Sequence, residues 1–141
     1  MHFNGVFSMG RKIVDFFYRP SDGAGLPTYA TAGNVTLLAS DLQQGIITRD
    51  CAGAARSDVL PTAAQIIDSL TVQGRAPVTG QGFLFTIRNT SGGAFATTLQ
   101  TAAGLTLVGS MAVAQSNAKI FFLIITGPTT VSIYSLGGSA F

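Results

Sequence analysis

The most constraining feature of this sequence is its closing stretch, KIFFLIITGPTTVSIYSL (residues 119–136), which carries one charge. A membrane-spanning helix needs roughly 20 mostly apolar residues. The uninterrupted apolar run, residues 120–125, is far shorter and is followed by a Gly-Pro turn signal. Polar and apolar residues then alternate, which places Val131 and Ile133 on one face of a strand. The stretch therefore predicts a hairpin, with a first strand buried on both faces and a second strand that is half-buried.

The preceding residues, from 81 onward, read as further strands. Turn signals separate them at roughly 8–12 residues, a spacing typical of an all-β sandwich or barrel. Alternation gives two of these strands an apolar face, made of Phe83, Phe85 and Ile87 in the first and Phe95, Thr97 and Leu99 in the second. Shorter strands are predicted around residues 105–107 and 111–113.

A short helix is predicted at about residues 62–70. Thr62 can cap its start, and Gln65 completes a capping-box pattern. The side chains of Ile66, Ile67 and Leu70 form an apolar stripe, and so short a helix must pack on a sheet to be stable. The predicted fold is thus all-β, a β-sandwich or jelly-roll-like barrel with one short helix, comprising a single β-rich domain at 27–141 and an N-terminal arm with its linker at 1–26.

Between arm and helix the pattern is weaker. It predicts a strand at 29–38, a helical turn at 42–45 and a strand at 45–48. The following segment, RDCAGAARSD (residues 49–58), is interpreted as a loop with two Arg/Asp pairs, Arg49 with Asp50 and Arg56 with Asp58. These pairs either lie solvated at the surface or join across a hairpin or between subunits, and exposed pairs contribute only about 0–1 kcal/mol.

Charge is scarce along the chain. Charged residues make up 10% of the sequence, against about 25% in an ordinary protein. After Asp68 the only charged residues are Arg75, Arg88 and Lys119. A soluble monomer normally carries more charge to stay apart from its neighbours. We therefore expect a permanent homo-oligomer, most simply a trimer, formed through strand-rich surfaces of the C-terminal half. A monomer solvated by its Ser and Thr hydroxyls is the alternative.

The N-terminal arm differs from the rest in its aromatic content. It ends in the Gly-rich stretch RPSDGAG, which is typical of a turning linker. Either the arm docks on a partner subunit, or it packs on its own domain, with a short helix around residues 13–17. The candidate partner-docking residues are Phe3, Phe7, Arg11, Lys12, Phe16, Phe17 and Tyr18.

No catalytic or metal-binding constellation is found in the sequence. His2 is the only histidine and Cys51 the only cysteine, so a catalytic triad, an internal disulfide and a His/Cys metal site are not expected. The residues after Asp68 contain no acid, which removes carboxylate pairs from the strand-rich half. The aspartates fit caps and turns, and Lys119 fits a strand-edge residue that discourages aggregation. We expect no enzyme activity and no cofactor.

Two classes of macromolecular partner are also not expected. A net charge of +2, with no basic run beyond Arg11-Lys12, does not indicate nucleic-acid binding. No apolar segment is long enough to suggest a membrane partner.

Two longer segments resemble a known group of proteins. They are GIITRDCAGAARSDVLPTAAQII and FLFTIRNTSGGAFATTLQTAAGLTLVGSMAVAQSNAKIFFLIITGPTTVSIYSL, and they lie within residues 45–136. Together they resemble a β-rich module in virion proteins of tailed DNA phages, namely decoration (cement) proteins and head- or fibre-associated proteins. The resemblance implies a structural, often multimeric virion protein on a capsid lattice, and it assigns no functional residues.

The sequence thus favours a capsid decoration subunit on the virion exterior. Made in the host cytoplasm, it would bind the major capsid protein and copies of itself, which accounts for the low charge, the missing chemistry and the aromatic arm. The alternative is a virion fibre or receptor/glycan-binding module. A glycan site usually combines exposed aromatics with carboxylates or amides, whereas the aromatics here alternate inward or lie in the arm. A small β-barrel enzyme is a third, less supported hypothesis.

Overall fold

A computed structural model of the chain describes residues 25–141. The seven partner-docking candidates of the N-terminal arm lie outside the described residues.

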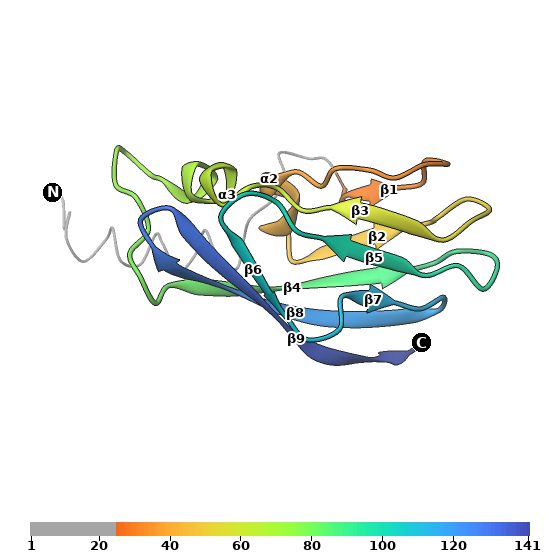
Figure 1. The fold of residues 1–141 in the computed structure, drawn as a ribbon. Coiled ribbons are helices and arrows are strands. Elements are labelled where there is room, and N and C mark those ends of the chain that lie inside the picture. Colours follow the sequence, from red (N-terminus) through yellow and green to blue (C-terminus); the bar gives the residue numbers. More distant parts are fainter. Residues whose placement is uncertain (1–24) are drawn as a thin grey trace, which may run out of the picture.

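The described part forms two sheets, and the smaller lies in front of the larger in Figure 1. The strands of the large sheet, in spatial order, are β1 (Thr28–Tyr29), β2 (Ile46–Arg49), β4 (Gly82–Asn89), β8 (Asn117–Gly127), β9 (Thr130–Ala140) and β6 (Leu105–Val108). The small sheet contains β3 (Arg56–Val59), β5 (Thr97–Gln100) and β7 (Ala112–Val113).

The all-β expectation is confirmed, in the form of a two-layer sandwich. Strands β4, β8 and β9 run antiparallel to one another in turn, whereas β1, β2 and β4 are mutually parallel and β6 is parallel to β9. Side chains alternate between the two faces of each strand, so every second residue enters the core. Phe85 and Phe121 are fully buried in that core, and their rings stack with centroids 5.2 Å apart.

The predicted helix is confirmed as α3 (Ala63–Leu70). Its capping box is complete, because the Thr62 hydroxyl accepts from the Gln65 backbone N–H and the Gln65 side chain accepts from the Thr62 backbone N–H. The Ile66 side chain is fully buried in the core, while Ile67 is only partly buried against it. The helix thus closes one end of the sandwich with one side of its apolar stripe (Figure 1).

The predicted closing hairpin is confirmed as β8 and β9, but β8 is not buried on both faces as expected. Its inward residues Phe121, Leu123 and Ile125 are buried. On the opposite face Ile120 is 43% exposed, because no second layer covers that side of the large sheet within the described residues. The apolar residues on the two faces of β8 therefore have different environments: one set lies in the core and the other forms an apolar surface.

The expectation of a strand at 29–38 is wrong. Only Thr28–Tyr29 pairs with β2, and further along only Thr36 forms an isolated bridge with Val59. Between them the backbone bends around Arg49, whose guanidinium donates to the carbonyl oxygens of Thr31 and Gly33, which a strand would use for pairing. The helical turn expected at 42–45 lies slightly earlier, as α2 (Ala39–Leu42), while the strand expected at 45–48 is confirmed as β2.

The interpretation of Lys119 as a strand-edge residue is wrong as well. Strand β8 lies between β4 and β9, so it has no free edge along this stretch. The Lys119 ammonium instead donates to the backbone carbonyls of Ser110, at 3.1 Å, and Ala112, at 2.6 Å. Lys119 therefore joins the large sheet to the segment that enters β7 of the small sheet.

The two isoleucines of α3 should differ in their contribution to stability. Ile66→Ala leaves a cavity in the closed end of the core, and we expect it to lower the free energy of unfolding by about 2–5 kcal/mol. Ile67→Ala, at a partly exposed position, serves as the matched control and should cost clearly less. Chemical denaturation of both variants measures the difference, and equal losses would contradict this docking of the helix.

Candidate functional site

The outer face of the large sheet is its most unusual surface. Strand register places four apolar residues in one row across four strands, which we call the central row. Leu84 of β4 pairs with Phe122 of β8. Phe122 pairs on its other side with Tyr134 of β9, and Tyr134 pairs in turn with Val108 of β6. Because side chains at paired positions point to the same side of a sheet, these four side chains form a continuous apolar band.

The residues beside the central row extend this apolar surface. Ile46 of β2, Ile120 and Ile124 share the outward orientation, with Thr86, Thr106 and Ser132 interspersed. Leu84 is 53% exposed, Val108 42% and Tyr134 38%. Exposed apolar side chains are ordinary when scattered singly, but a contiguous patch marks a binding surface. The outer face is therefore the candidate functional site of the described chain.

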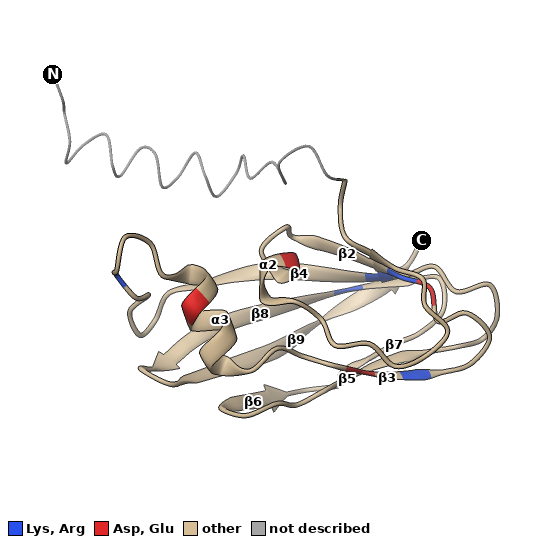
Figure 2. Cartoon of the chain, turned by 90° about the horizontal axis from the view of Figure 1, so that it is seen from above, with Lys and Arg blue, Asp and Glu red and all other residues tan. Residues whose placement is uncertain are grey.

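Charge is confined to the margin of this face. The two strands that carry half of the central row, β9 and β6, contain no charged residue and are tan along their length in Figure 2. Arg88 is the outward charge on β4, and its guanidinium carbon lies 4.1 Å from the centre of the Phe141 ring. A cation stacked on an aromatic ring in this way covers part of the ring. The middle of the outer face is thus uncharged.

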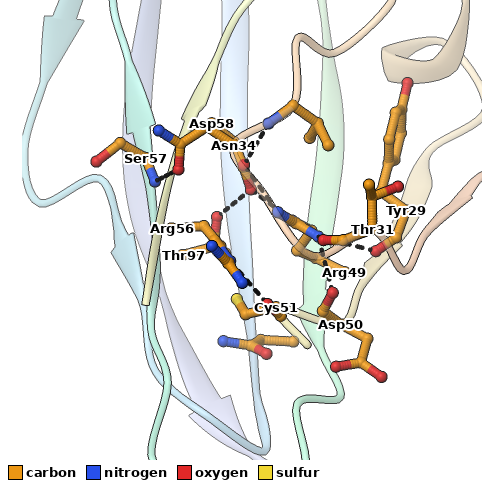
Figure 3. A network of polar contacts seen from close by, with 12 residues as sticks. Tyr29, Thr31, Asn34, Arg49, Asp50, Cys51, Arg56, Ser57, Asp58 and Thr97 are labelled. Atoms are coloured by element: carbon orange, nitrogen blue, oxygen red, sulfur yellow. Dashed lines mark hydrogen bonds and ion pairs between the residues drawn. The ribbon is translucent and has the colours of Figure 1, made fainter. Parts of the chain in front are cut away.

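A second notable group of residues lies inside the sandwich, around Arg49. The Arg49 side chain is 1% exposed, and its Nε lies 2.7 Å from a carboxylate oxygen of Asp58. The remaining guanidinium nitrogens donate to that carboxylate and to the backbone carbonyls of Tyr29, Thr31, Gly33 and Asp50. Figure 3 shows the guanidinium among Asp58, Tyr29, Thr31 and Asp50. This group connects β2 of one sheet to β3 of the other.

Of the two alternatives for residues 49–58, the solvated loop is wrong for Arg49 and Asp58, and the charges instead join across the segment, although not as the neighbouring Arg49/Asp50 and Arg56/Asp58 pairs. The segment's first residue belongs to β2 and its last three to β3, and the ion pair joins Arg49 to Asp58. Arg56 donates to the backbone carbonyls of Cys51, at 2.8 Å, and Ala52, at 3.1 Å. The segment folds back on itself between the sheets, so residues nine positions apart meet in the core.

The carboxyl group of Asp58 is strongly stabilised in its charged form. Burial alone raises the pKa of Asp58, but hydrogen bonds from Arg49, the Thr97 hydroxyl and the Val35 backbone N–H, with the charge of Arg49, hold it below its ordinary value. Both carboxylate oxygens thus accept hydrogen bonds from within the protein. The Arg49–Asp58 group is therefore a structural element and leaves no open position for a ligand.

The remaining polar groups offer little chemistry. The Tyr29 hydroxyl donates to Asp41 beside an open depression; burial and this bond raise the pKa of Tyr29 to about 12. Cys51 is buried. Within residues 25–141 no group of three or more His, Cys, Asp or Glu side chains could hold a metal ion. None of the helices in this part of the chain is long and apolar enough to cross a membrane.

Comparisons with protein-family models, with curated proteins and with solved structures found no match for this chain. The assignment of the outer face as the candidate functional site therefore rests on its geometry alone. Sequence reasoning placed the candidate docking residues in the N-terminal arm and expected self-association through strand-rich surfaces of the C-terminal half, but it did not identify which face of which strands is exposed. The signal of this face was present in residues 120–125, where every position is apolar and both faces of the strand were assigned to the core.

Removing one partner of the buried ion pair should be costly. Asp58→Asn leaves the Arg49 charge buried without its counter-ion, and such changes destabilise a protein by about 3–5 kcal/mol. Asp68→Asn, at an exposed position on α3, is the matched control and should change stability little. Urea denaturation at pH 7 compares them, and a small effect of Asp58→Asn would mean that water or other groups compensate the charge.

The same pair predicts a dependence on pH. Since the folded-state pKa of Asp58 lies below its ordinary value of 3.8, its stabilising contribution is complete above that value. The contribution is lost as the pH falls through the lower folded-state pKa. We therefore expect the stability gap between the parent and Asp58→Asn to narrow below about pH 3.8. A gap that stays constant down to about pH 2 would contradict the assignment.

Proposed function

We propose that this chain is a structural virion protein, a capsid decoration or cement subunit. It lies on the capsid exterior, stabilises contacts between major capsid proteins and associates with itself, most simply as a homotrimer. The observation that carries the proposal is the uncharged, apolar outer face of the large sheet. Such a face is poorly suited to water and well suited to contact with other protein.

Further support comes from how the polar groups are used. Arg49, Asp58 and Lys119, three charged residues of the sandwich, bond within the molecule and hold the two sheets together. Side chains committed to holding the framework leave the surface to serve as a contact area. Charged side chains used in this way are typical of a structural subunit, whereas an enzyme places charged side chains in an accessible cleft. The resemblance to phage virion proteins points in the same direction.

The alternative function, a virion fibre or receptor/glycan-binding module, has one feature in its favour. Tyr134 exposes an aromatic ring on the outer face. Its neighbours in register, Phe122 and Val108, are apolar, whereas a glycan site needs carboxylates or amides beside the ring. The outer face therefore fits a protein partner better than a sugar. A glycan array probed with the purified protein tests this alternative directly.

The N-terminal arm should be needed for binding to the particle. A chain that starts at Leu26 lacks all seven docking candidates, whose aromatic and basic side chains are of the kinds that dominate interfaces. We expect it to keep an unchanged β-type circular dichroism spectrum and to lose co-sedimentation with virus particles. Cryo-electron microscopy of particles with the full chain provides the positive control. A truncated chain that unfolds would show that the arm belongs to the core.

A further inference from the structure

We propose that a second copy of this chain covers the outer face of the large sheet, with the central row at the middle of the contact. The inference deepens the proposed role as an assembly subunit and rests on it. It assigns the self-association surface to residues of β4, β8, β9 and β6. The N-terminal arm then remains available for the capsid.

The chemistry of the face favours a partner of the same kind. The central row of Leu84, Phe122, Tyr134 and Val108 carries no charge, so a charged partner surface would lose its hydration without gaining a counter-ion. The interspersed hydroxyls, such as those of Thr86 and Thr106, can bond to equivalent hydroxyls of another copy. A surface that mixes apolar side chains with hydroxyls is complementary to itself, as the isologous contact of a two-fold dimer requires. This interface therefore makes a dimer, whereas a trimer would need the face to meet a different surface of the next copy.

The size of the face also fits a subunit contact. Five strands from β2 to β6, at about 4.8 Å apiece, make the face about 24 Å wide. At about 3.3 Å per residue, the four-residue strands β2 and β6 extend about 13 Å, the eight-residue β4 about 26 Å and the eleven-residue β8 and β9 about 36 Å. The planar footprint of about 500–600 Å², enlarged by side-chain relief, approaches the roughly 800 Å² that each partner buries in a standard interface. A single covering segment, about 10–12 Å wide even as a helix, would leave half of this width bare.

The first experiment introduces a charge into the central row of the full-length chain. Tyr134→Lys and Leu84→Lys place an ammonium group where the second copy would lie. The matched control is Gln100→Lys, at an exposed position of β5 on the small sheet. In sedimentation velocity the parent and the control should be oligomeric, and both central-row variants should weaken association at least tenfold while retaining the parent's circular dichroism spectrum.

The second experiment identifies the occupant by cross-linking, which does not depend on a destabilising charge. Cys51, the only cysteine, is fully buried, so one added cysteine is the accessible thiol. Tyr134→Cys, treated with a short bis-maleimide, should give cross-linked dimers at protein concentrations at which Gln100→Cys does not. The chain starting at Leu26 should cross-link equally well through the same residue.

Several outcomes would overturn the inference. A monomeric parent in which the thiol of Tyr134→Cys reacts freely with a maleimide would show that no second copy covers the face. A monomer in which that introduced thiol is protected only when residues 1–25 are present would show that the chain's own arm covers it. The proposed virion function fails separately: oligomers that do not bind particles would leave this interface intact, and monomers that bind particles would support the function and reject the interface.

Discussion

The sandwich depends above all on the buried contact between Arg49 and Asp58. Arg49 is at the end of β2 in the large sheet and Asp58 is in β3 of the small one, so the ion pair fixes the distance and register between the layers. The guanidinium also donates to the backbone carbonyls of Tyr29, at the end of β1, and of Thr31 and Gly33 in the segment after it. A charge so deeply buried is tolerated only because each nitrogen has an acceptor. The hydrogen bonds to the Arg49 guanidinium therefore hold the bend of the chain between residues 29 and 35.

A second polar contact between the sheets supports the same arrangement. The buried Asn89, at the end of β4, donates its amide protons to the backbone carbonyls of Phe95, which precedes β5, and Val113 of β7. Its side-chain oxygen accepts from Ser91, whose hydroxyl in turn accepts from the Cys51 backbone N–H. Polar groups therefore specify how the two layers face each other, while the apolar core between them supplies most of the burial.

The two faces of the large sheet have different surroundings although both are largely apolar. Strand β8 carries apolar residues at every position from Ile120 to Ile125, and the inward ones meet the small sheet and α3. Close approach along this strand is aided by Gly82 and Gly138, where an added Cβ would lie 2.2 Å from a carbonyl oxygen of β8. The outward residues meet no layer of the described chain. The proposed contact with a second copy would bury these outward apolar side chains and so account for their number.

The local patterns of the sequence determined much of this protein. The capping box at Thr62 and Gln65, the alternation in β4 and the Gly-Pro turn between β8 and β9 depend on neighbouring residues, and each predicted its element correctly. The scarcity of charged residues indicated that part of the surface is covered by other protein. We propose that this part is the outer face of the large sheet. Only the tertiary structure decided which charges pair, because Arg49 and Asp58 meet through the packing of two sheets. It also decided which side of β8 lies in the core, because a period-two pattern cannot distinguish the buried face of a strand when the residues on both faces are apolar.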